Sequence, residues 1–104
     1  MTDRSEYELE LTINRHFIKR VIIDQHYKEN HPDVTDEIIL ELVASLDGED
    51  FPVEVQKGDF EYLTVEPAFR EEAPYRLIMV ICIYDDYLGV INAFRVERGK
   101  HEKK

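Results

Sequence analysis

Residues 15–29, RHFIKRVIIDQHYKE, decide how the chain folds. Apolar side chains recur in this stretch at helical spacing, namely Phe17, Ile18, Val21, Ile22 and Ile23. The pattern predicts a helix over the whole stretch, with Asn14 as its cap. The helix must end near His31-Pro32, because a residue before proline is pushed out of the α region. Residues 15–29 therefore predict the first of two consecutive helices.

The second helix is expected directly after this proline. Thr35 or Asp33 can cap it, and the following Asp36-Glu37 pair suits the positive end of the helix dipole. Its buried stripe is predicted to comprise Ile38, Ile39, Leu42, Val43 and Leu46. Asp47-Gly48 ends it. Because few residues separate the two helices, we expect them to be neighbours in space.

Five further stretches have strand character: Tyr7–Ile13, Phe51–Gln56, Phe60–Val65, Tyr75–Tyr84 and Leu88–Val96. The first alternates polar and apolar residues, as in a half-buried strand. Tyr75–Tyr84 is apolar at almost every position, which is typical of a central strand covered on both faces. The predicted fold is therefore α+β, in the order β-α-α-β-β-β-β, with two N-terminal helices packed on a mainly antiparallel sheet.

The length of 104 residues predicts a single domain over residues 1–104, with frayed ends at 1–5 and 98–104. The chain has one cysteine, Cys82, so a disulfide scaffold is excluded and a reducing compartment is expected. Residues 1–10 lack the apolar core of a signal peptide. The longest apolar run, Leu77–Tyr84, is too short to span a membrane. We expect a soluble cytoplasmic protein that does not bind membranes.

The net charge of −10 is unevenly distributed. Residues 15–31 and 95–104 are basic, whereas residues 33–75 are strongly acidic. A net negative charge of this size repels nucleic acid. The basic segments form an anion site if they lie together; the alternative is an ordinary solvated charge pattern.

The sequence contains no phosphate-binding glycine loop, no His-Glu-x-x-His helix and no cysteine cluster. His26 and His31 have Asp24 and Asp33 nearby, but no recognised metal-ligand spacing joins them. We therefore predict no metal and no cofactor. Cys82, inside an apolar strand, is expected to be a core residue rather than a nucleophile.

Several polar residues stand where the pattern favours apolar neighbours: His16 at the start of the first predicted helix, and Arg76, Asn92 and Arg95 on apolar strands. Buried arginines need an anionic partner, a ligand or water. One interpretation is that the arginines lie at an edge and meet acidic side chains. The other is an anion site in which His16 is a general acid or base and Arg76 and Arg95 offset phosphate charge.

The segments Ile13–His16 with Arg20, His31–Asp36, Pro74–Ile78 and Gly89–Arg95 resemble the RelE/ParE toxin superfamily, and most closely an uncharacterised bacterial family allied to it. The resemblance implies a RelE-like fold and a metal-independent ribonuclease of the toxin–antitoxin type. It also implies RNA or the ribosome, and a cognate protein, as partners. The implied catalytic residues are His16, Arg20, Arg76 and Arg95, and the substrate-binding residues are Arg15, Lys19 and Asn92.

The net charge departs from this family, because ribosome-directed toxins are normally basic and gain most of their affinity by neutralising phosphates. A second hypothesis is a non-enzymatic interaction module, whose acidic surface binds a basic protein or mediates self-association. The ribonuclease hypothesis predicts that His16, Arg76 and Arg95 converge. The module hypothesis predicts that they are scattered or in salt bridges, with an exposed patch involving Tyr62, Phe69 or Tyr87.

Overall fold

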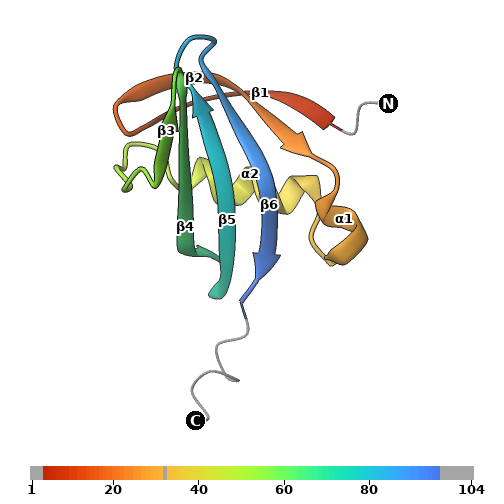
Figure 1. The fold of residues 1–104 in the computed structure, drawn as a ribbon. Helices are drawn as coiled ribbons and strands as arrows, with labels where there is room; N and C mark the ends of the chain where they lie inside the picture. Colours follow the sequence, from red (N-terminus) through yellow and green to blue (C-terminus); the bar gives the residue numbers. More distant parts are fainter. Residues whose placement is uncertain (1–3, 32, 97–104) are drawn as a thin grey trace.

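The computed structural model describes residues 4–31 and 33–96, and its main feature is one six-stranded mixed sheet (Figure 1). The elements are β1 (Arg4–Ile13), β2 (His16–Asp24), α1 (Tyr27–Asn30), α2 (Asp36–Ala44), β3 (Val55–Lys57), β4 (Phe60–Arg70), β5 (Ala73–Cys82) and β6 (Tyr87–Arg95). The strand order is β1-β2-β6-β5-β4-β3. Neighbouring strands are antiparallel except β2 and β6, which are parallel.

The predicted fold with two N-terminal helices is wrong, because residues 16–24 form strand β2 and only a single helical turn, α1, follows it. The misleading helical pattern has a physical cause in the β1–β2 ladder. Its register shifts between Glu8 and Leu11, and on β2 both Ile18 and Val21 are buried although they are three positions apart. That spacing imitates a helix. The β-branched residues of this stretch favour a strand, which packs their side chains well.

A two-residue turn at Asn14-Arg15 joins β1 to β2, in place of the predicted helix cap. Both residues have positive φ, 55° and 67°, as in the type I′ turns that match the twist of antiparallel strands. The side-chain oxygen of Asn14 accepts a hydrogen bond from the Phe51 amide. The turn thereby fixes the hairpin against the segment that leads to β3.

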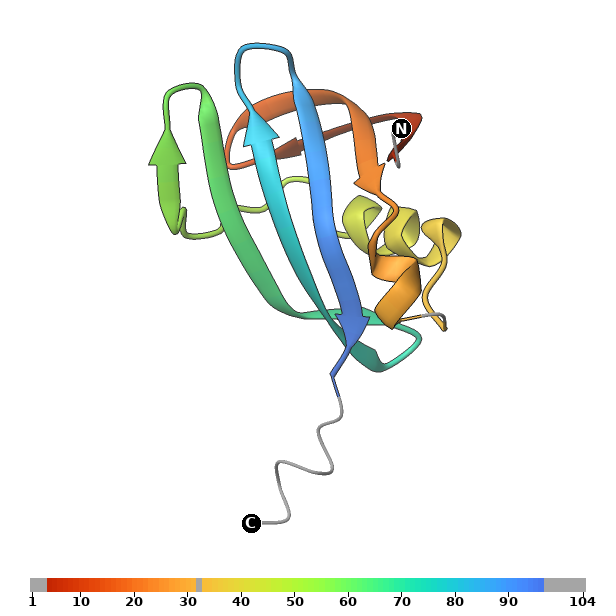
Figure 2. The same cartoon turned by 45° about the vertical axis from the view of Figure 1, so that its right-hand side comes forward.

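The second predicted helix is confirmed as α2. Thr35 caps it, since its hydroxyl accepts a 3.2 Å hydrogen bond from the Ile38 amide. Its buried side chains Ile39, Leu42 and Val43 face the core. Figures 1 and 2 show α2 crossing one face of the sheet. The core lies between this helix and the strands.

The central strand β5 is buried along one face, whereas its other face is partly exposed except at the buried Cys82, contrary to the expectation of full cover on both faces. Its residues alternate between buried positions, such as Leu77 and Met79, and partly exposed positions, such as Ile78 and Val80. The side chains of Ile78 and Val80 lie on the face opposite α2, opposite Thr64 and Tyr62 of β4. This face of the sheet is therefore only partly covered by the described part of the chain.

The predicted strand boundaries also change at the chain reversals. The expected polar connection of residues 68–74 is mostly strand, because β4 continues to Arg70 and β5 begins at Ala73. Glu71 and Glu72, with φ of 53° and 71°, form the tight turn between them. Of the ends expected to fray, Arg4 and Ser5 belong to β1, whereas residues 1–3 and 98–104 lie outside the described residues.

Candidate functional site

The histidine predicted to be catalytic, His16, opens β2 rather than a helix. Its Nε2 atom is 3.5 Å from Oε1 of Glu61 on β4, and both side chains are partly buried. The carboxylate of Glu61 is thus the acidic partner of this imidazole. None of the predicted arginines shares this contact.

Arg20 on β2 is held by two carboxylates from different parts of the chain. Its Nη2 atom donates a 2.7 Å hydrogen bond to Asp85, and its Nε atom is 3.1 Å from Glu6 on β1. The hydrogen bond to Asp85 raises the pKa of Arg20. Its guanidinium also lies over the Tyr87 ring, 5.4 Å from the centroid. The Arg20 charge is therefore engaged within the protein.

The other two predicted catalytic arginines lie at the opposite end of the sheet. Arg76 is 3.3 Å from Glu66, and Arg95 is an exposed residue at the end of β6. Along β6, Tyr87 pairs with Arg20 and Phe94 pairs with Arg76, so about 20 Å of strand separates the two arginines. The structure does not bring the four predicted catalytic residues together.

The predicted substrate-binding residues are also dispersed. Arg15 lies 3.7 Å from Asp50, and Lys19 lies 3.8 Å from Asp86. Asn92 uses its side-chain oxygen locally, accepting a 2.9 Å hydrogen bond from the next amide along the chain. These residues occupy the hairpin turn, β2 and the far half of β6.

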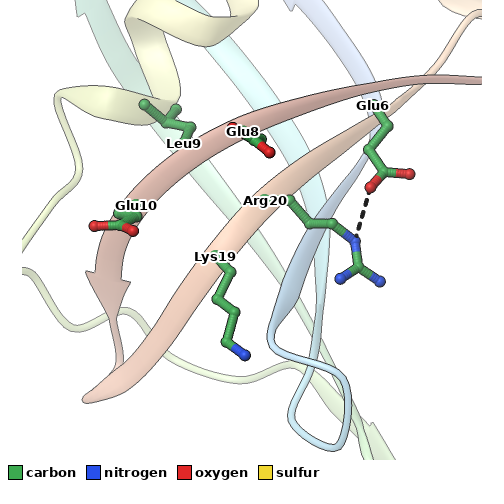
Figure 3. Close-up of a pocket in the computed structure, with 6 residues that line it drawn as sticks. All are labelled: Glu6, Glu8, Leu9, Glu10, Lys19 and Arg20. Atoms are coloured by element: carbon green, nitrogen blue, oxygen red, sulfur yellow. Dashed lines mark ion pairs between the residues drawn. The ribbon is translucent and has the colours of Figure 1, made fainter.

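A hollow in the surface of the described residues lies over the β1–β2 hairpin. It has a volume of about 630 Å³ and is lined by Glu6, Glu8, Leu9, Glu10, Lys19 and Arg20. Figure 3 shows the three glutamates along β1, with the two basic side chains on neighbouring β2. Alternation explains the arrangement, since Glu6, Glu8 and Glu10 are exposed while the intervening Tyr7 and Leu9 are partly buried.

The charges around this pocket do not balance. Arg20 is engaged by Glu6 and Asp85, and Lys19 by Asp86. Within residues 4–31 and 33–96, neither Glu8 nor Glu10 takes part in an ion pair. We define the acidic row as Glu6, Glu8 and Glu10; two of its three carboxylates carry uncompensated charge. The sequence alternation contained this signal, but it did not reveal that β1 is an edge strand.

The two histidines weighed as metal ligands have other partners. His26 Nδ1 lies 2.7 Å from Asp24, and the His31 ring stacks on Phe94 with centroids 4.9 Å apart. Burial alone would raise the pKa of Asp24, but the hydrogen bonds from the His26 amide and ring lower it overall. In the part of the chain that the structure describes, no three potential ligands gather as a metal site.

Comparison of the chain with protein-family models, curated proteins and solved structures finds no match in any of the three. None of the helices among the described residues has the length and apolar character needed to cross a membrane.

Proposed function

We propose that the protein is a non-enzymatic interaction module that binds a basic segment of another protein along the acidic row of β1. The observation that carries the proposal is the uncompensated charge of Glu8 and Glu10 beside an open pocket. Lysine or arginine side chains of a partner supply the missing positive charge. The net charge of −10 adds a long-range attraction for the same class of partner.

The positions of the basic residues favour this function over a ribonuclease. Phosphate-binding arginines must converge on one phosphoryl group to stabilise its charge. Here Arg20 and Arg76 are far apart, and each is paired with a carboxylate. The ribonuclease prediction stays untested, but it has no assembled group of side chains to support it.

The proposal is tested by titrating a fluorescent lysine-rich peptide with the purified protein, with a glutamate-rich peptide of equal length as the negative control. We expect binding of the lysine-rich peptide only, and weaker binding as salt rises, because exposed charges are screened. Glu8→Lys/Glu10→Lys should lower the affinity at least tenfold.

A matched variant separates local from overall charge. Asp33→Lys/Glu72→Lys changes the net charge equally at exposed positions outside the acidic row. It should retain most of the affinity. An equal loss of affinity in both double variants would show that binding follows net charge alone. That result would contradict a site on β1.

A second experiment tests directly whether the protein cleaves RNA. Free and ribosome-bound RNA is incubated with the protein in EDTA, beside His16→Ala and Arg95→Ala. The proposal expects intact RNA in every reaction. Cleavage by the wild type that is lost in both variants would overturn the non-enzymatic assignment.

A further inference from the structure

Strand β1 is an edge of the sheet, with β2 on one side and no further strand of residues 4–31 and 33–96 on the other. Only its last residues are covered along that free side. The Gly48 amide donates a 2.7 Å hydrogen bond to the Thr12 carbonyl, and the Thr12 amide donates to the Asp47 carboxylate. Within the described chain, the segment from Arg4 to Glu10 has no such cover. It leaves about 20 Å of strand edge open.

The direction in which the main-chain groups of β1 point can be inferred from β2, because β2 is paired on both sides. In a strand of this kind, alternate residues direct their N–H and C=O groups to opposite neighbours. The Lys19 amide donates a 2.8 Å hydrogen bond to the Asp86 carbonyl, just before β6. Lys19 and every second residue after it therefore face β6. Arg20 and Ile22, which alternate with them, direct their main-chain groups at β1.

The same alternation locates the open groups on β1. Glu8 and Glu6 are the partners of Arg20 and Ile22, so their main-chain groups face β2. The N–H and C=O groups of Ser5 and Tyr7 consequently point to the free edge. An extended peptide can hydrogen-bond to these groups and extend the sheet.

We propose that the occupant of this edge is an extended segment of a partner protein in which lysine or arginine alternates with apolar residues. This inference rests on the proposed function and adds the mode of binding. With a period of two, the basic side chains of the added strand lie on the same side as the acidic row, and the apolar ones lie beside Tyr7 and Leu9. The charge of the acidic row and the open main-chain groups of β1 then favour the same kind of partner segment.

A second copy of β1 does not fit this edge equally well. Pairing two copies would bring the acidic rows of both to one side of the enlarged sheet, and like charges on neighbouring strands are destabilising. Charged residues on edge strands commonly prevent self-association of this kind. The acidic row thus disfavours a homodimer through β1 and leaves a basic strand as the complementary partner.

The test compares three labelled peptides of the same composition: alternating lysine and valine, a scrambled order, and the alternating order with alternate main-chain amides N-methylated. Methylation removes hydrogen-bond donors along one edge but keeps the charge. We expect the unmodified alternating peptide to bind at least tenfold more tightly than the other two. It should also slow hydrogen exchange of the Ser5 and Tyr7 amides.

Two results with the peptides would overturn strand addition, and they differ in what they imply for the proposed function. Equal binding of all three peptides, without added protection of Ser5 and Tyr7, would leave a charge-based interaction module and refute the strand. No binding of any basic peptide would refute both. On the protein side, Ser5→Pro removes an edge N–H and should lower the affinity about tenfold while circular dichroism stays unchanged. An unchanged affinity in this folded variant would also refute strand addition.

Discussion

The Tyr7 hydroxyl donates a 2.6 Å hydrogen bond to the Asp36 carboxylate, which joins the edge strand β1 to the first turn of α2. The Gln25 side chain donates to both oxygens of the same carboxylate, at 3.2 Å. Strand β1, helix α2 and the residue that follows β2 therefore meet at one acidic group. This contact holds the inner side of β1 in place, while the acidic row on its outer side stays exposed.

Removing the hydroxyl should weaken this junction. Tyr7→Phe deletes the donor to Asp36 and should lower the free energy of unfolding by about 1 kcal/mol, the usual net value of such a bond at a partly exposed site. Urea denaturation measures the change. Tyr84→Phe is the matched control, because Tyr84 is 83% exposed. Equal stability of the Tyr7 variant and the wild type would show that the bond contributes nothing.

The contribution of Tyr7 should also depend on pH. The hydrogen bond to Asp36, followed by burial, raises the pKa of Tyr7 above its ordinary value of 10.0. A group whose pKa is higher in the folded state stabilises the protein fully below pH 10 and loses this effect as the pH rises through the folded-state pKa. The stability difference between wild type and Tyr7→Phe should thus be constant near neutrality and shrink above pH 10. A difference that grows there would contradict the assigned donor.

Gly89 on β6 lies close to a side chain of the neighbouring strand. A Cβ atom at this position would lie 3.0 Å from Cγ1 of Val80 on β5. Gly89→Ala should therefore destabilise the protein by about 1 kcal/mol through overpacking. In the Val80→Ala background the same substitution should cost clearly less, since the clashing methyl group is gone. Additive effects of the two substitutions would exclude this contact as the cause.

Local signals in the sequence were sufficient to predict an element wherever residues close together in the sequence determine its structure. The Thr35 cap and the acidic first turn located α2 correctly, and the alternation of residues 7–13 identified β1. The strand character of β5 and β6 was also evident. The end of β4 and the start of β5 were not, because the Glu71-Glu72 turn between them requires positive φ at residues that seldom adopt it.

The predictions from the sequence were wrong where contacts between distant segments determine the structure. Whether residues 15–29 form a helix or a strand depends on pairing with β1 and β6, and the register shift opposite Lys19 disguised the strand periodicity. The same error placed His16 and Arg20 on a helix and suggested that they could converge with Arg76. Likewise, no local pattern reveals that β1 is an edge strand, since that depends on the order of strands in the sheet.

The most direct test of the central claim is to map the binding of the alternating lysine–valine peptide by NMR chemical shifts. The account predicts that the largest shifts fall on residues 4–10 of β1 and on Lys19 and Arg20 beside them. Shifts concentrated on the partly covered face around Ile78 and Val80, with β1 unaffected, would contradict binding at the acidic row.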